Sequence, residues 1–274
     1  MSVWTPARVG RSFGAAFVVL AFVPPLLLLV SGSLRPPGLP PPPRPELVPD
    51  PVSVQGYTEA VELGGLLRAS LNSLAVAAVA VPVSVLVAAL AGYALTRLSR
   101  RLAGLVAAAS LAALMVPATA LLVPKFAIFR ALGWTDTLVP LVMPALLGTS
   151  PLYPLVYYLA FRTLPVDLLD VCRMEDLSPL RIWWRVAMPL VRPVTAAIAA
   201  LTFVLTWSNF LDPLVYVYDR ELFTLPLALR SLSTLDPTNF PVFLAGAVLA
   251  TVPALLVFGL AQRTFLYSDG GKHP

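Results

Sequence analysis

The stretch D-V-C-R-M-E-D-L-S-P-L-R-I-W-W-R-V-A-M-P-L-V-R-P, residues 170–193, decides how this chain is organised. It is a polar and basic segment between two strongly apolar ones. Ser178 followed by Pro179 predicts a helix start, because a serine hydroxyl can accept from an unpaired amide and proline has no amide to lose. Before it, Pro165 is expected to open a short helix that reaches Glu175.

The chain must turn between these two helices, and we place the turn at Asp176. Aspartate tolerates a left-handed backbone better than most residues. Pro189 and Pro193 are expected to stop or kink the second helix, since proline removes a helical hydrogen bond and clashes with the preceding turn. The stretch therefore predicts a short, exposed helix–turn–helix.

The composition around this stretch is that of a membrane protein. With 58% hydrophobic residues, 12% charged residues and a mean hydropathy of +0.83, a soluble domain of 274 residues is excluded. The net charge of +5 then needs no nucleic acid to explain it. The single cysteine, Cys172, excludes an intramolecular disulfide, and the single histidine, His273, excludes a histidine-based metal site.

Apolar runs predict six membrane spans. Each holds roughly 18 to 23 residues without a charge, which at about 1.5 Å per residue suffices for a hydrocarbon core of about 30 Å. Continuous runs without the alternation of barrel strands predict helices, so the expected fold class is an all-α polytopic membrane protein. The spans are residues 13–30, 74–95, 102–122, 138–160, 193–211 and 241–261, with a kink at Pro117 and breaks at Gly148, Pro151 and Pro154.

The segments outside the membrane follow from these spans. Residues 31–70 form a polar loop with nine prolines between Pro36 and Pro51, which favours extended polyproline geometry and a stiff external spacer. A short interfacial helix is expected after Gln55. The first span is longer than the apolar core of a signal peptide, so we expect it to remain uncut.

The distribution of positive charge predicts the orientation. With both termini inside, twelve Lys and Arg residues lie in the cytoplasm and seven lie outside. Residues 1–12 and 266–274 are then the cytoplasmic ends of a membrane domain spanning residues 13–265. Residues 163–192 become a cytoplasmic loop.

Several kinds of chemistry have no residues to support them. The chain contains no G-x-x-x-x-G-K-[ST], H-E-x-x-H or C-x-x-C motif, so we expect no ATP hydrolysis, catalytic residue, cofactor or metal in this chain. The interiors of the spans carry no Asp, Glu, Lys, Arg or His. Transporters coupled to ions or protons usually need one, which favours a separate ATPase as the driving force. A secondary transporter or facilitator that acts without ATP remains the alternative.

Residues 170–193 resemble the cytoplasmic loop of binding-protein-dependent ABC importer permeases, whose consensus runs E-A-A-x-x-D-G-A-S followed by two prolines. The register is unbroken from Asp170 through Ser178 to Pro189 and Pro193. Further stretches are similar to the carbohydrate, maltose-type permeases: L-N-S at 71–73 with G-Y-A-L-T-R at 92–97, M-V-P at 115–117 with L-G-W-T-D-T at 132–137, and W-S-N-F at 207–210 with T-L-P at 224–226. The loop departs from the consensus at Asp170, Val171, Cys172, Glu175, Asp176, Leu177 and Met188.

The resemblance implies a type I ABC importer permease fold and one half of a channel made by two permease chains. Its implied partners are a second, different permease subunit, two ATPase subunits, a solute-binding protein and the lipid bilayer of a bacterial or archaeal inner membrane. The implied cargo is a sugar or oligosaccharide. Another solute, such as a phosphorylated polyol, is the alternative within the family.

Two sets of site residues follow from the resemblance and from residue type. The set expected to contact the ATPase is Asp170, Val171, Cys172, Glu175, Asp176, Leu177, Ser178, Trp183, Trp184 and Pro189. Trp183 and Trp184 are candidate anchors. Adjacent helical residues face about 100° apart, and membrane-interface anchoring is the alternative for one of the two. Cys172 replaces a small alanine, so we expect it to face the partner closely.

The residues expected along the translocation path are polar and aromatic side chains inside the spans. They are Asn72, Ser73, Tyr153, Tyr157, Trp207 and Asn209, with Thr149, Ser150, Tyr158, Thr206 and Ser208 as further candidates. Hydrogen bonds between helices and aromatic anchoring at the membrane interface explain such residues equally well.

Overall fold

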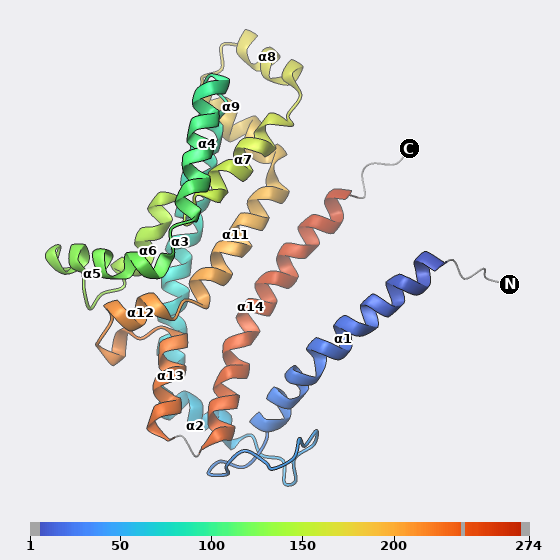
Figure 1. Ribbon diagram of the computed structural model, residues 1–274, viewed down its shortest axis with the longest axis vertical. Coiled ribbons are helices and arrows are strands. Elements are labelled where there is room, and N and C mark those ends of the chain that lie inside the picture. Colours follow the sequence, from blue (N-terminus) through green and yellow to red (C-terminus); the bar gives the residue numbers. More distant parts are fainter. Residues whose placement is uncertain (1–5, 237–238, 270–274) are drawn as a thin grey trace. The chain divides into compact units, whose positions relative to one another are not determined.

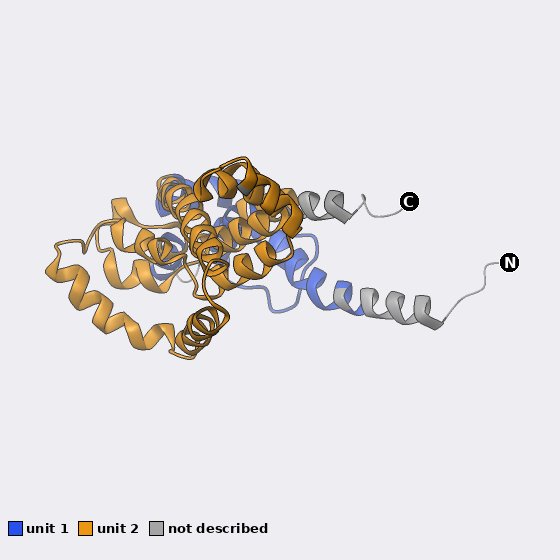
Figure 2. Ribbon diagram, turned by 90° about the horizontal axis from the view of Figure 1, so that it is seen from above, with its two compact units in different colours: residues 1–67, 228–252 blue, residues 68–227, 253–274 orange. Residues whose placement is uncertain are grey.

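A computed structural model describes residues 6–236 and 239–269, and in these residues the chain contains helices, turns and loops but no β-strand. The all-α prediction is confirmed. The chain divides into two compact units, residues 1–67 with 228–252 and residues 68–227 with 253–274 (Figure 2). The longer helices are α1 (Pro6–Ser33), α3 (Leu66–Leu95), α4 (Arg100–Leu114), α7 (Leu152–Arg162), α11 (Arg192–Trp207), α13 (Leu225–Leu235) and α14 (Phe240–Asp269) (Figure 1).

In the first unit, helices approach one another closely at glycines. A Cβ added to Gly32 of α1 would collide with the side chain of Leu244 in α14, and one added to Gly246 of α14 would lie 2.7 Å from the side chain of Leu229 in α13. The hydroxyls of Ser33 and Tyr57 share a hydrogen bond of 2.7 Å. Tyr57 belongs to α2 (Gln55–Gly64), which is the short helix predicted after Gln55.

The proline-rich segment between α1 and α2 contains turns and bends but no helix, and it is not the extended, stiff spacer that was predicted. The Ser53 amide donates to the Leu34 carbonyl at 2.7 Å, which brings the two ends of the segment together. The hydroxyl of Ser31, in the last turn of α1, donates to the Glu46 carbonyl at 2.5 Å, and Arg35 pairs with the Glu46 carboxylate at 3.8 Å. The segment is a closed loop held by side chains from its start.

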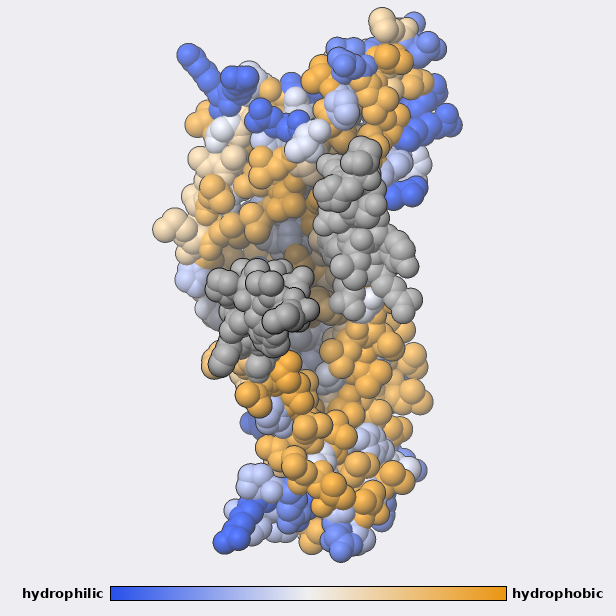
Figure 3. Space-filling view, turned by 90° about the vertical axis from the view of Figure 1, so that its right-hand side faces the viewer, coloured by the Kyte–Doolittle hydropathy of each residue, from blue (hydrophilic) through white to orange (hydrophobic). Residues whose placement is uncertain are grey.

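Three helical segments of the described chain are long and apolar enough to cross a membrane, namely Leu66–Leu95, Val139–Arg162 and Phe240–Leu260. Two further pairs of helical segments are each bent at a short break: 100–114 with 118–131, and 179–190 with 192–207. If each bent pair is counted as one span, the number of spans rises to five. The first predicted span falls within α1, whose apolar part among the described side chains is the shorter Val19–Ser33. Hydrophobic side chains cover much of the face shown in Figure 3. A polytopic membrane protein is confirmed, and the count of six spans stays a prediction.

The third predicted span is shorter than expected. Helix α4 ends at Leu114, and the chain bends by 87° before the 3₁₀ turn Ala118–Leu121 and α5 (Leu122–Ala131). Pro117 causes the bend, because proline disfavours a helical conformation in the residue before it. Residues 102–122 are therefore not one straight span.

The fourth predicted span is broken in its middle. Helix α6 (Val139–Val142) and a 3₁₀ turn (Met143–Leu147) precede Gly148 and Thr149, which both adopt left-handed conformations with φ of 74° and 62°. The break at Gly148 and Pro151 was predicted correctly. Pro154 was wrongly expected to break the helix, because it lies in the first turn of α7, where a missing amide costs no hydrogen bond.

Helices α3, α7 and α11 pack around a shared core in the second unit. A Cβ added to Gly92 of α3 would lie 2.5 Å from the Tyr157 Cβ and 2.7 Å from the Pro154 carbonyl of α7. The Tyr157 hydroxyl of α7 donates to Thr195 of α11 at 3.1 Å, and the Thr202 hydroxyl of α11 donates to Ser84 of α3 at 3.4 Å. Small residues at close contacts and hydroxyl bonds between helices are the usual means of association in a membrane.

Candidate coupling surface

Helix α8 (Val166–Met174) ends in a left-handed turn at Asp176, where φ is 52°. The Leu177 amide donates to the Cys172 carbonyl at 3.2 Å, and the Glu175 amide donates to the Val171 carbonyl at 3.1 Å. A bond spanning six residues around a left-handed residue is the usual helix C-cap, which otherwise favours glycine. The turn predicted at Asp176 is confirmed.

The second helix begins at Pro179, as predicted, with Ser178 as its extended N-cap residue. The Ser178 carbonyl accepts from the Ile182 amide at 3.0 Å. Its hydroxyl makes no cap hydrogen bond in the described part of the chain, so the predicted position is right and the predicted hydroxyl contact is wrong. The start of α9 (Pro179–Ile182) depends on the backbone and on proline's restricted φ.

The helix then widens into a π turn, Trp183–Ala187, in which the Met188 amide donates to the Trp183 carbonyl. In a regular α-helix, Pro189 would leave the Arg185 carbonyl without a donor and its ring would clash with it, and a π turn relieves this conflict. After α10 (Met188–Leu190) the chain bends by 84° into α11. The bend lies at Val191, between the two prolines that were expected to produce it.

One side of this bent segment belongs to the core. Trp183, Ala187 and Val191 are buried in a cluster formed with the aromatic side chains of Tyr93, Tyr153, Tyr157 and Phe161. Trp183 is only 3% exposed, so the prediction that it anchors a partner is wrong. Its indole nitrogen is buried without a hydrogen-bond partner in the described chain.

The other side presents apolar and acidic side chains to solvent, and we call it the coupling surface. It consists of the exposed residues Val171, Met174, Glu175, Asp176, Leu180 and Trp184. Trp184 is 64% exposed, so the two neighbouring tryptophans lie in opposite environments. Met174 and Leu180 were not predicted. Met174 could have been found from its spacing, because residues three apart on a helix share a face and Val171 was already a candidate.

The remaining predicted residues divide between exposed and buried positions. Asp170 and Ser178 are exposed, while Leu177 and Pro189 are half-buried. Cys172 is only 7% exposed and has turned inward, away from its exposed neighbour Val171. The expectation that its thiol faces a partner is therefore wrong.

Several residues predicted along a translocation path hold loops instead. The Asn72 side-chain amide donates to the Glu221 and Phe223 carbonyls at 2.8 and 3.0 Å. The Ser73 hydroxyl accepts from the Leu225 amide, at the start of α13, at 2.8 Å. The Asn209 side chain donates to Asp212 at 2.8 Å and accepts from its amide at 3.3 Å, at the start of α12 (Leu211–Tyr216).

The aromatic candidates for the path are buried between helices. Tyr153 and Tyr157 are both buried, and Tyr157 forms the α7–α11 hydrogen bond described above. Trp207 is buried as well and stacks on Phe203, with ring centroids 5.4 Å apart. The alternative of helix–helix contact accounts for these positions, and whether they also line a path stays a prediction.

The loop that contains the L-G-W-T-D-T stretch, residues 132–137, has a structural role that the sequence did not predict. The Asp136 carboxylate accepts from the Tyr218 and Asp219 amides at 2.9 and 2.8 Å, and its own amide donates to the Tyr216 carbonyl at 2.7 Å. The two amide donors, led by that of Asp219, hold the pKa of the Asp136 carboxyl below its ordinary value of 3.8. Asp136 thus ties two loops that are distant in sequence.

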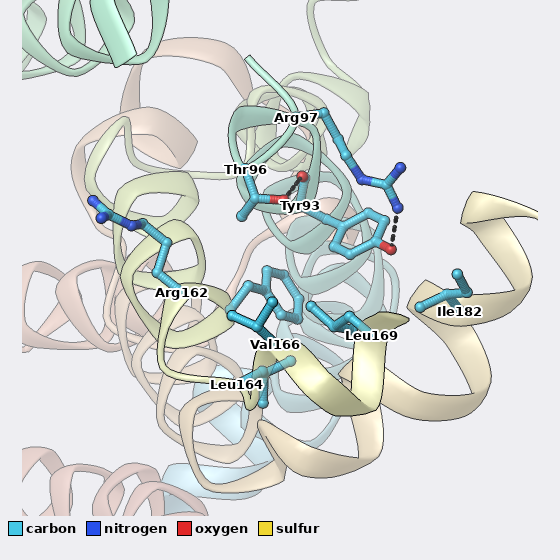
Figure 4. A pocket seen from close by; sticks show the side chains of 9 residues that line it. Tyr93, Thr96, Arg97, Arg162, Leu164, Val166, Leu169 and Ile182 are labelled. Carbon is cyan, nitrogen blue, oxygen red and sulfur yellow. Dashed lines mark hydrogen bonds between the residues drawn. The ribbon is translucent and has the colours of Figure 1, made fainter. Parts of the chain in front are cut away.

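A pocket of about 210 Å³ lies beside the buried side of the coupling segment (Figure 4). Its lining residues come from the ends of α3 and α7 and from α8 and α9: Tyr93, Thr96, Arg97, Phe161, Arg162, Leu164, Val166, Leu169 and Ile182. Most of these side chains are apolar, and the charged ones are arginines. Among the described residues, no group of three or more His, Cys, Asp or Glu side chains could hold a metal ion.

Comparison with known proteins identifies the family of this chain. Residues 80–265 match the binding-protein-dependent transport system inner membrane component family. The chain is 30% identical over 265 residues to the arabinooligosaccharides transport system permease protein AraQ of Halalkalibacterium halodurans, covering 93% of this chain and 92% of that protein. It is 29% identical to the lactose transport system permease protein LacG of Rhizobium radiobacter, over 71% of each chain. A bacterial ABC transporter involved in alginate import has a chain that superposes with a TM-score of 0.77 at 19% identity, over 97% of this chain and 100% of that one.

Proposed function

This chain belongs to the family of binding-protein-dependent transport system inner membrane components, and from that premise we propose that it forms half of the translocation channel of an ATP-driven sugar importer. It is a multi-pass inner-membrane permease subunit of an ABC importer and not itself an enzyme. The observation that carries the coupling part of the proposal is the exposed apolar and acidic surface on the bent segment of residues 166–190.

We propose that an ATPase subunit docks on the coupling surface. Trp184 supplies the aromatic anchor, because exposed tryptophans that become buried dominate interface energies. Asp170, Glu175 and Asp176 supply polar contacts, and Ser178 lies exposed between the two helices. The buried residues Cys172 and Trp183, with Leu177 and Pro189 partly buried, support this surface from beneath.

The wider assembly is proposed from the family. It comprises a second, different permease chain, two ATPase subunits and a solute-binding protein, arranged around a type I permease fold of six spans. Both termini and residues 163–192 face the cytoplasm, which agrees with the excess of Lys and Arg assigned to that side.

A sugar or oligosaccharide is the proposed cargo. Relatives described as permeases for arabinooligosaccharides, lactose and trehalose support this solute class. For the path itself, the broken fourth span is the strongest structural lead, because non-helical backbone at membrane depth is tolerated where it is enclosed by protein or lines a watery cavity. Thr149 and Ser150 at this break join Asn72, Ser73, Tyr153, Tyr157, Trp207 and Asn209 as proposed path residues.

The test uses the complete importer in liposomes, with sugar uptake and sugar-stimulated ATP hydrolysis measured together. Trp184→Ala is expected to weaken ATPase docking by roughly 30-fold, the effect of losing about 2 kcal/mol at an interface anchor. Leu105→Ala is the control, because Leu105 is a similarly exposed apolar residue on α4, outside the coupling surface. Unchanged docking in Trp184→Ala would contradict the coupling proposal, and uptake without any ATPase would contradict an ATP-driven importer.

A further inference from the structure

Two arginines at the ends of membrane helices are held in the same way. Arg97 follows the end of α3, with its guanidinium 4.9 Å from the centroid of the Tyr93 ring and a hydrogen bond of 2.6 Å to the Tyr93 hydroxyl. Arg162 ends α7, with its guanidinium 5.6 Å from the Tyr158 ring and 3.4 Å from the Tyr158 hydroxyl. In each case a tyrosine one helical turn earlier fixes the cation, through cation–π attraction and a hydrogen bond.

Neither arginine has a carboxylate partner within ion-pair distance in the described chain. Both guanidiniums are exposed, and the ion pairs found among the described residues involve Arg35 and Arg68, which lie in other segments. A guanidinium offers five donors in a planar fork, of which a tyrosine hydroxyl uses one. Each arginine therefore keeps donors for a planar or tetrahedral oxyanion.

The two arginines flank the pocket beside the coupling segment. Figure 4 shows Arg97 beside Tyr93 on one flank of the apolar lining and Arg162 on the other flank, with the Arg162 guanidinium directed away from the lining. Leu164, Val166, Leu169 and Ile182 supply apolar lining, so the pocket combines the Arg97 cation at its edge with an apolar wall. A ligand that fits both features carries an anionic group next to hydrocarbon.

The position of the pocket identifies the source of such a ligand. Leu66–Leu95 and Val139–Arg162 are apolar enough to span a bilayer, so Arg97 and Arg162 lie where hydrocarbon gives way to headgroups. Basic pockets between helices at this level bind the headgroups of anionic lipids. We propose that this pocket binds an anionic phospholipid of the inner leaflet, with its phosphodiester on the Arg97 guanidinium and Arg162 adding positive charge nearby.

The site has a consequence for coupling, because Val166 and Leu169 belong to α8 and Ile182 belongs to α9. A lipid seated against these side chains braces the coupling segment on the ends of α3 and α7. Anionic lipid is then expected to stabilise the segment that the proposed ATPase contacts. This expectation concerns the lipid site and holds whether or not the cargo is a sugar.

The experiment measures lipid retention by the purified full chain. Native mass spectrometry follows binding of phosphatidylglycerol and of phosphatidylcholine with the same acyl chains. The wild type is expected to retain phosphatidylglycerol preferentially. Arg97→Gln should weaken this retention by about tenfold or more, the effect expected for a hydrogen bond to a charged group. Arg101→Gln is the matched control, because Arg101 is an exposed arginine in the first turn of α4, four positions after Arg97, and lies outside the pocket lining.

A second pair of variants guards against misfolding of Arg97→Gln. Val166 is 65% exposed at the pocket lining, so Val166→Glu introduces a carboxylate there without burying it, and Val166→Gln introduces the neutral equivalent. Val166→Glu should expel phosphatidylglycerol, and Val166→Gln should retain it. Equal losses in Arg97→Gln and Arg101→Gln would reduce the site to general surface charge and overturn the proposal.

Two further outcomes would also overturn it. Competition by inorganic phosphate at the same concentration as the lipid would show that the pocket binds a free anion and ignores hydrocarbon. Unchanged lipid retention in Arg97→Gln, together with weaker capture of the ATPase subunits, would assign Arg97 to a protein carboxylate on that partner.

Discussion

At Gly92, one added methyl group is expected to destabilise the contact between α3 and α7. A Cβ there would lie 2.5 Å from the Tyr157 Cβ, 2.7 Å from the Pro154 carbonyl oxygen and 2.9 Å from the Tyr158 amide nitrogen. All three neighbours are backbone atoms or a Cβ, so no side-chain rotation relieves the collision. Gly92→Ala therefore forces α3 and α7 apart by roughly 1 Å, given ordinary carbon contacts of about 3.5–4.0 Å.

The free-energy cost follows from that separation. Overpacking a well-packed contact costs about 1–3 kcal/mol, and three rigid neighbours place Gly92→Ala at the upper end of that range. Replacing glycine by alanine inside a helix returns about 1 kcal/mol. The free energy of unfolding should therefore fall by about 2 kcal/mol, which for a chain of this size lowers the midpoint of thermal unfolding by roughly 4–8 °C.

The chain provides its own reporter for this measurement. Cys172 is the only cysteine and is buried, so a fluorogenic maleimide reports unfolding of the detergent-purified protein as the thiol becomes exposed. Gly104→Ala is the matched control, because a Cβ on Gly104 of α4 would meet no atom within 4 Å. That variant should keep or raise the midpoint. A Gly92→Ala midpoint equal to that of the wild type, or an equal fall in Gly104→Ala, would refute the close α3–α7 contact.

Three further predictions concern single side chains. Trp183→Ala should lower the free energy of unfolding by about 3–5 kcal/mol as a core deletion, whereas Trp184→Ala should change it by less than about 0.5 kcal/mol; similar thermal midpoints for the two variants would contradict their opposite burial. Cys172 in the folded protein should react slowly with maleimide both with and without the ATPase, and fast labelling of the ATPase-free protein would contradict its burial. The depressed pKa of Asp136 stabilises the fold above its unfolded value of 3.8 and is lost as pH falls through the lower folded value. Asp136→Asn should therefore flatten the fall of the unfolding midpoint below about pH 4, and identical pH profiles would count against the Asp136 contact.

Local signals in the sequence predicted local structure well. The turn at Asp176, the helix start at Pro179 and the break at Gly148 each depend on the backbone preference of one or two residues. The 87° bend at Pro117 was foreseen as a kink but not in its size. The size depends on what α5 packs against, and proline alone does not specify that.

Contacts between distant residues could not be predicted from the sequence. Asn72 and Ser73 satisfy backbone groups about 150 positions later in the chain, and no periodicity in a single sequence reports such a pairing. Trp183 is buried and Trp184 is exposed at the start of the π turn Trp183–Ala187. Helical spacing alone could separate the two tryptophans but could not say which one faced inward.

The packing around Trp183 explains how a force applied to the coupling surface can reach the membrane helices. Trp184 is exposed, but its neighbours Trp183 and Ala187 lie in the same buried cluster as Tyr157 of α7 and Ile198 of α11. Closely packed interiors transmit displacement because they have few voids to absorb it. The segment before Val191 lies at 84° to α11, and under the proposed function a displacement of its exposed side would act on α11 and α7 together. Because α7 begins three residues after the left-handed Thr149, a displacement of α7 would act on a span whose backbone is already broken.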